Sequence, residues 1–360
     1  MNLSLRKLST SLGVTLVLCL MVVGVVAAES SVLTLPQATE LALTNSISLQ
    51  IAKLNYDNSK IAYDKAILAD PTPLQKRNAD ITWESAQATF RSAKNDVIIS
   101  VFTAYMSVLS AMADVEIKEK QAQQALNNWE RTKILVAKGN ASPTNELQAE
   151  MSNMTAQNNL DRSRDSLASA LYKLQHLLGL DKLPDQLADV ELIAPPLDVD
   201  LESAIAAGLA ANTQLKSLRT NYELLLLQRE QDLATGLAPL DDRKSQNDLK
   251  VAELNLAEAE ANSIDSITTQ YNSLLQALKG IAVSEASLIL SQKQYDITKK
   301  QVDAGMKTPN DLLADEINLL SAKNSLHEAY RSYVSSWMSF QKTLGRDINI
   351  SEVVKSDGSK

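Results

Sequence analysis

The sequence holds little of what catalytic, metal or disulfide chemistry requires. Its 360 residues include one cysteine, Cys19, and two histidines, His176 and His327. Cys19 lies in an apolar run near the start, so a chain that loses this run has neither thiol nor disulfide. The two histidines lie in different predicted helices, and no Ser/His/Asp set or phosphate-binding glycine loop can be placed. We therefore expect no enzyme, no metal site and no cofactor.

Glycine, proline and aromatic residues are also scarce, with 10 Gly, 9 Pro and 4% aromatics. A chain rich in Ala, Leu, Gln, Glu, Lys and Asn with so few helix breakers favours long helices. The formal net charge is −8. Nucleic-acid binding needs basic patches, so this acidic chain is not expected to have a nucleic-acid partner.

Residues 1–28 are typical of a secretory signal. Arg6 and Lys7 precede an apolar run over residues 12–26, and small residues stand just before Glu29. We expect cleavage there and export to the cell envelope. The alternative is a retained membrane anchor, because the run is close to the lower length limit of a spanning helix.

The sequence contains an internal repeat. A shift of 166 residues places residues 129–179 on residues 295–345 without a gap. The pairs brought together are Gly139 with Gly305, Pro143 with Pro309, Glu150 with Glu316, and Leu178-Gly179 with Leu344-Gly345. A constant offset of this kind comes from duplicated structure. We predict a first helical repeat over residues 29–198, a second over 199–345, and a polar C-terminal tail over 346–360.

Glycine and proline divide each repeat into a short, a long and a second short helix. The expected helices are 37–69, 75–138 and 144–178, then 202–235, 241–304 and 310–344. Apolar residues step by three and four along them, as in Leu326, Tyr330, Tyr333, Trp337, Phe340 and Leu344, which favours coiled-coil packing. The predicted fold is all-α, with two short helices end to end beside a long one of about 95 Å. Two such units form an elongated antiparallel sheet of helices, a segment of an α-barrel, whose apolar edges predict self-association.

These features together resemble the outer-membrane efflux protein family, the TolC-like exit ducts. The resemblance rests on the duplication, the helix order and the opening of each repeat, Leu-Thr-Leu-Pro-Gln-Ala-Thr-Glu-Leu-Ala-Leu-Thr-Asn from Leu33 and its echo from Val199. The segments around Gly139 and Gly305, each closing on Leu-Gly, add to it. The resemblance covers nearly all of residues 33–345.

The resemblance implies a homotrimeric tube that works in multidrug efflux or type I export. Its far end would meet a periplasmic adaptor protein, and through it an inner-membrane pump, at the turns 138–144 and 304–310. The adaptor-facing residues implied are Gly139, Asn140, Ser142, Pro143, Gly305, Lys307 and Pro309. The family pattern also places acids at the pore entrance, where Asp311 matches one position and Asp315 follows the non-acidic Ala314. Asp311 is equally suited to a helix cap.

The connections at residues 69–75 and 235–241 depart from the family, which carries a β-hairpin at each of these places. A membrane-spanning strand needs about 9–11 residues, so neither connection has room for two. We expect a helical tube without a membrane-spanning barrel. The alternative function is a non-conducting, structural coiled-coil protein of the cell envelope. A pump adaptor fits less well, because adaptors carry flanking β domains.

Overall fold

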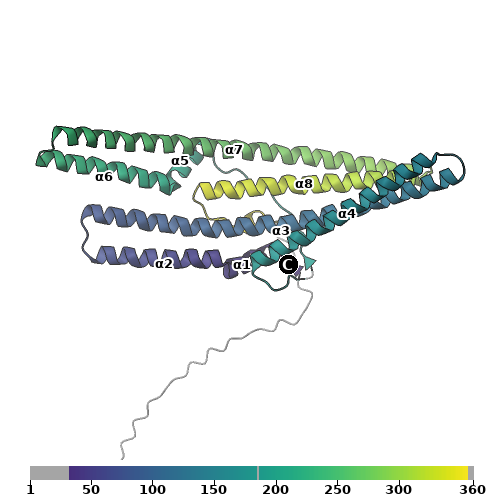
Figure 1. Cartoon of the computed structure of the whole chain (residues 1–360), viewed down its shortest axis with the longest axis horizontal. Helices are drawn as coiled ribbons and strands as arrows, with labels where there is room; N and C mark the ends of the chain where they lie inside the picture. Colours follow the sequence, from purple (N-terminus) through teal and green to yellow (C-terminus); the bar gives the residue numbers. More distant parts are fainter. Residues whose placement is uncertain (1–31, 185, 356–360) are drawn as a thin grey trace, which may run out of the picture.

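The computed structural model describes residues 32–184 and 186–355. The predicted signal and the last five residues of the predicted tail lie outside the described residues. Within these ranges the chain folds into eight α-helices, with two short strands and one 3-10 turn (Figure 1). In chain order they are β1 (Val32–Leu33), α1 (Leu35–Asn45), α2 (Ile47–Leu68), α3 (Pro73–Ala137), α4 (Pro143–Leu178), β2 (Gln186–Leu187), α5 (Leu201–Ala211), α6 (Thr213–Thr235), α7 (Pro239–Asp303), α8 (Pro309–Thr343) and η1 (Ile350–Glu352).

The two halves of the chain have the same helix order and nearly the same helix lengths. In the first copy α1 to α4 have 11, 22, 65 and 36 residues. In the second copy α5 to α8 have 11, 23, 65 and 35 residues. The predicted all-α repeat of short, long and short helices is confirmed.

The first short helix of each copy is divided in two, which the sequence analysis did not anticipate. α1 ends and α2 begins around Ser46, whose backbone is extended (φ −61°, ψ 112°) and whose hydroxyl accepts a hydrogen bond from the amide of Leu49. Asn212 does the same between α5 and α6, accepting from the amides of Gln214 and Leu215. Side chains that cap a new helix from within compete with continuous helical bonding, so the axis breaks at these positions.

The long helices α3 and α7 run almost the whole length of the molecule (Figure 1). α2 packs beside one part of α3 and α4 beside the other, while α6 and α8 divide α7 in the same way. The short helices are thus arranged end to end along each long one, as predicted. The connection from α2 to α3 spans residues 69–72, that from α6 to α7 spans residues 236–238, and neither contains a strand.

The main hydrophobic core lies at the middle of the molecule, where the two copies join. α3 contributes Val101, Phe102 and Tyr105, all fully buried. α8 contributes a run of large buried side chains: Tyr333, Val334, Trp337, Met338 and Phe340. α1, the end of α4 and the segment between the copies complete this core. Away from it, packing is mostly between pairs of helices.

The described part of the predicted tail belongs to this core, so its assignment as a polar tail is corrected for residues 346–355. Ile348, Ile350 and Val353 are buried, and Val354 pairs with Leu192 in an antiparallel bridge. The segment is polar on average, but its few apolar residues all point inward. Nearby, β1 pairs in parallel with β2, with Leu33 opposite Leu187.

Tyr105 ties the core to both strands. Its hydroxyl lies 2.7 Å from the carbonyl oxygen of Leu33 and 2.8 Å from that of Ala188, and donates to this pair of acceptors. The Leu33 carbonyl also accepts from the amide of Ala188. Burial raises the pKa of Tyr105 to about 12, with a further contribution from the charge of Asp189. The repeat-equivalent Tyr271 makes no side-chain hydrogen bond within residues 32–355 that the structure describes.

Replacing Tyr105 by Phe is expected to lower the free energy of unfolding by about 1–2 kcal/mol, because the Ala188 carbonyl loses a donor in a buried place. Tyr271→Phe, the matched control, should change it little. Above pH 10 the unfolded chain ionises at Tyr105 while the folded chain does not, so the wild-type protein loses stability there. The difference in the free energy of unfolding between the wild-type protein and Tyr105→Phe should therefore become smaller from pH 10 towards pH 12, as measured by urea titrations. A constant difference would contradict the assigned burial of the hydroxyl.

Candidate functional site

The two predicted docking turns lie at the same end of the molecule (Figure 1). In the first, the amide of Asn140 bonds the carbonyl of Leu135, and that of Gly139 bonds the carbonyl of Val136. The second repeats this pattern, from Met306 to Gln301 and from Gly305 to Val302. This is the Schellman helix ending, which needs a left-handed residue, and φ is +74° at Gly139 and +70° at Gly305.

Side chains cap the N-termini of the helices that follow the two turns, α4 and α8. The Ser142 hydroxyl accepts from the amide of Asn145 at 3.3 Å. Thr308 and Asp311 form a reciprocal capping box, since the Thr308 amide donates to the Asp311 carboxylate at 2.8 Å and the Asp311 amide donates to the Thr308 hydroxyl at 3.3 Å. Hydrogen bonds from Thr308 lower the pKa of Asp311, and the charges of Lys307 and Arg131 lower it further. Asp311 therefore caps α8, and a role for it or for Asp315 at a pore entrance stays a prediction.

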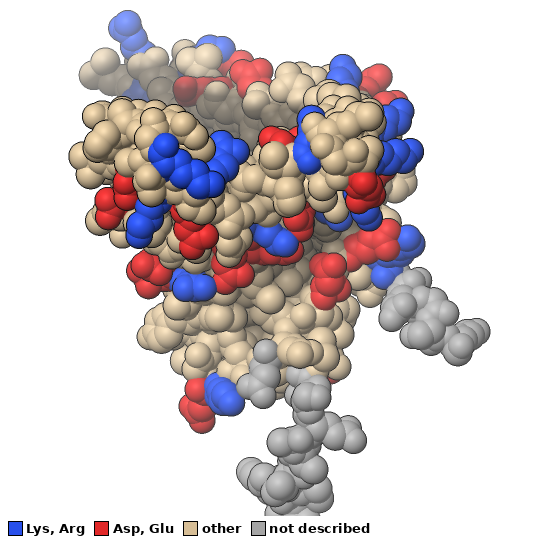
Figure 2. All heavy atoms as spheres, turned by 90° about the vertical axis from the view of Figure 1, so that its right-hand side faces the viewer, with Lys and Arg blue, Asp and Glu red and all other residues tan. Residues whose placement is uncertain are grey.

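All the predicted adaptor-facing residues are exposed at this end: Gly139, Asn140, Ser142, Pro143, Gly305, Lys307 and Pro309. Met306 projects between Gly305 and Lys307 and is 78% exposed. Figure 2 looks onto this end and shows basic and acidic side chains interspersed around it. The surface thus has no single sign of charge, and it presents small, amide and apolar groups at its tips.

Polar contacts that sequence reasoning missed hold the two turns side by side. The Asn310 amide group donates to the side-chain oxygen of Asn128 at 2.8 Å, and that of Asn127 donates to Asn310 at 3.4 Å. Further from the turns, the ammonium of Lys120 lies 2.8 Å from the carboxylate of Glu316. α3 and α8 are therefore joined near the turns by amides and an ion pair, whereas apolar side chains join them at the core. Only the spacing of these polar residues at helical intervals hints at the contact.

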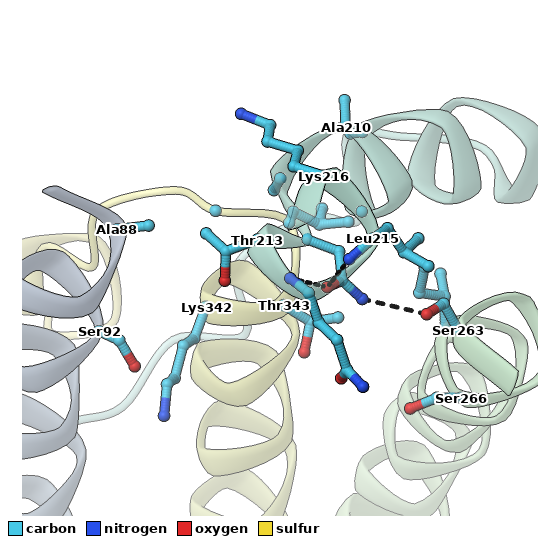
Figure 3. A pocket seen from close by; sticks show the side chains of 18 of the residues that line it. Ala88, Ser92, Ala210, Thr213, Leu215, Lys216, Ser263, Ser266, Lys342 and Thr343 are labelled. Atoms are coloured by element: carbon cyan, nitrogen blue, oxygen red, sulfur yellow. Dashed lines mark hydrogen bonds between the residues drawn. The ribbon is translucent and has the colours of Figure 1, made fainter. Parts of the chain in front are cut away.

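A second feature is a cleft of about 1380 Å³ between the two copies. Small and polar side chains from α3, α6 and α7 line it (Figure 3): Ala88, Ser92, Thr213, Ser263 and Ser266. An ion pair of 3.0 Å between Lys216 and Glu84 links α6 to α3 at the cleft. The side chain of Asn212 donates to Ser263 at 3.0 Å, which fixes the start of α6 on α7. The sequence gives no sign of this cleft, because it arises where the copies diverge.

Over the described residues, no group of three His, Cys, Asp or Glu side chains is arranged to hold a metal ion. By length and composition alone, two described helical stretches could cross a membrane, Gln75–Ala137 and Pro239–Asp303. Both are the long helices of the repeat, and the most apolar stretch of the second helix is only 11% buried. That exposure matters for the assembly considered below.

The comparisons with known proteins agree with this geometry. Over 296 residues the chain is 21% identical to the alkaline protease secretion protein AprF of Pseudomonas aeruginosa, a match that covers 69% of this chain and 61% of AprF. No protein-family model matches the sequence. The outer-membrane channel CmeC of Campylobacter jejuni superposes with a TM-score of 0.59 at 14% identity, covering 96% of this chain and 94% of that one.

The chain has the fold of these outer-membrane channels. The outer-membrane protein VceC of Vibrio cholerae gives a TM-score of 0.59 at 15% identity, with 88% of this chain and 97% of that one covered. The open MtrE outer-membrane channel of Neisseria gonorrhoeae gives 0.60 at 14% identity, with 87% and 89% covered. The resemblance to TolC-like proteins predicted from the repeat is confirmed at the level of the fold.

The turn glycines provide a test of the left-handed backbone conformation in the predicted docking turns. Gly305→Ala is expected to lower the free energy of unfolding by about 1 kcal/mol, because an alanine at positive φ is strained although nothing lies within 4 Å of the added carbon. Gly280→Ala is the matched control: this glycine lies inside α7 with equally open space, so alanine should stabilise by about 0.5–1 kcal/mol. Chemical unfolding followed by circular dichroism measures both. Equal effects of the two substitutions would contradict the left-handed turn.

Proposed function

We propose that this chain is an exit-duct component of an efflux or type I export assembly in the cell envelope. The single observation that supports this most is the superposition of almost the whole chain on outer-membrane channels. The likeness to a protease secretion protein favours export of the same general kind. The proposed partners are further copies of the chain, an adaptor outside the cytoplasm and an inner-membrane pump.

The edges of the helical sheet support closure into a tube. Near the docking end, contacts run from α4 to α3, from α3 to α8 and from α8 to α7, so α4 and α7 are the two edges. Each edge exposes large apolar side chains: Leu147, Met151 and Met154 on α4, and Val283, Leu290 and Ile297 on α7. The two edges differ, so α4 of one chain can pack on α7 of the neighbouring chain in the assembly. Such head-to-tail contacts form a closed ring when the rotation from one chain to the next closes, and the family form is a trimer.

The exported protein is therefore expected to be a trimer in light scattering. With Cys19 replaced by Ser, a chain carrying Met154→Cys and Leu290→Cys together should form disulfide-linked ladders ending at three copies. Each single-cysteine variant should stay mostly uncrosslinked, because the two edges meet each other and not themselves. A compact monomer at high concentration, or disulfide-linked dimers from the single-cysteine variants as abundant as those from the double variant, would exclude this closure.

The docking turns support contact with a helical-hairpin adaptor. Their backbone is fixed by the Schellman endings and caps, so the exposed residues between them are free to vary without loss of the fold. The conducting role is favoured over a purely structural one by the turns' exposure and by their position at the end opposite the short connections. Those connections, residues 69–72 and 236–238, are the observation that favours the structural alternative.

A charge change at the turns tests the docking role. Asn140→Glu combined with Lys307→Glu is expected to leave helicity and assembly intact and to weaken adaptor binding about tenfold. Asp311 is kept, because it caps α8.

Cysteines at Ser142 and Lys307 should crosslink to a partner in the envelope, and control cysteines at Asp70 and Asp241 should not. Crosslinks from the control positions alone would reverse the assigned orientation.

A further inference from the structure

Within one chain the two repeats meet where α3 packs against α8, a contact that we call the intrachain seam. Lys120 lies opposite Glu316, with 2.8 Å between the ammonium nitrogen and the carboxylate oxygen. Asn128 lies opposite Asn310, whose amide group donates to its side-chain oxygen at 2.8 Å. The two helices run antiparallel (Figure 1) and rise equally per residue. These two contacts therefore determine which residues of α3 and α8 face each other along the seam.

The repeat relates the intrachain seam to the two free edges of the sheet. With the offset of 166 residues, α3 corresponds to α7 and α8 corresponds to α4. On α3, Ile117 is 6% exposed, whereas its equivalent Val283 on α7 is 70% exposed. On α8, Ile317 is 7% exposed, whereas its equivalent Met151 on α4 is 60% exposed. Each edge therefore has the apolar pattern of one side of a seam and lacks the other side.

We propose that α4 of one chain packs on α7 of the next in the register of the intrachain seam, and we call this contact the interchain seam. The proposal rests on the proposed function, because it needs the sheet to close into a tube. It goes further by assigning the residues that face each other. The pair Lys120 and Glu316, shifted by the repeat, becomes Ala286 of one chain opposite Glu150 of its neighbour.

A small cavity in the intrachain seam supports the same register. Ile117 and Leu320 both line this cavity, which has a volume of about 250 Å³ and lies between α3 and α8. Their repeat equivalents place Val283 opposite Met154 in the interchain seam. These two side chains are 70% and 59% exposed in the single chain, so their contact buries apolar surface on both edges.

The interchain seam differs from the intrachain seam in one charged pair. Glu150 retains the carboxylate, but Ala286 stands where the intrachain seam has a lysine. The α7 lysines on either side, Lys279 and Lys293, are each one heptad from Ala286, or about 10 Å along the axis. Among the residues that the structure describes, Glu150 has no ion-pair partner. The interchain seam is therefore held by apolar contacts and contains an acid without its lysine.

Disulfide formation between chains tests the register. With Cys19 replaced by Ser, Leu147→Cys with Leu290→Cys, and Met154→Cys with Val283→Cys, are expected to crosslink rapidly, because each pair is in register. Met154→Cys with Leu290→Cys is one heptad out of register, about 10 Å, and should crosslink about tenfold more slowly. Crosslinking of this last pair as fast as the other two would overturn the register and leave the tube intact. Crosslinking of none of the three pairs would overturn the proposed tube as well.

Restoring the missing lysine tests the residue pairing. Ala286→Lys is expected to stabilise the assembly at low salt about threefold per seam, the effect of a partly exposed ion pair with Glu150. High salt should remove this gain, and the same lysine should give no gain in a Glu150→Gln background. Urea-induced dissociation followed by light scattering compares the wild-type protein, both single variants and the double variant. No gain from Ala286→Lys, or an equal gain in the Glu150→Gln background, would overturn the assigned pairing.

Discussion

The structure depends on how a helix of 65 residues finds a partner along its whole length. Such a helix is about 97 Å long, and no single short helix can cover its apolar face. In each copy the short helices lie end to end along the long helix and cover it together. The place where their ends meet is called the joint here. At that joint the strands, the segment between the copies and the C-terminal segment fill the space, and the main hydrophobic core of the described residues forms there. Tyr105 lies on α3 at the joint, and its hydroxyl attaches the segments around Leu33 and Ala188 to this long helix.

The two ends of the molecule expose different kinds of side chain. At one end Gly139 and Gly305 allow tight turns with hydrogen-bonded caps, and amides and charges surround them. At the other end Leu68, the last residue of α2, and Leu240, in the first turn of α7, are highly exposed. The two turns at one end are alike in polarity, and so are the two at the other end, but the two ends differ from each other. The molecule therefore has two chemically distinct ends. This difference follows from the duplication, because both copies place the same kind of turn at the same end.

Much of the fold could be predicted because helix lengths appear in the sequence as intervals between glycine and proline. The positions of Pro143 and Pro309 as first residues of α4 and α8 follow from this. The breaks at Ser46 and Asn212 could not be predicted, because single Ser or Asn residues are common inside helices. The C-terminal segment was misjudged because Ile348, Ile350 and Val353 stand among polar residues. The turns at Gly139 and Gly305 were located from the sequence, but the Asn310 contacts and the cleft depend on distances between the two repeats, which local patterns do not contain.

The buried C-terminal segment has a consequence for the order of folding. The apolar side chains of Ile350 and Val353 join the same core as Leu33 and Leu35, at the opposite end of the described chain. Helix pairs such as α3 with α4 are close in sequence and can form as soon as both have been made. The core at the joint cannot be completed until the chain is available almost to its last described residue. A contact of such long range carries a large loop-closure entropy and forms late. A truncated chain therefore exposes the apolar side chains at the joint, which makes it a substrate for proteases and chaperones.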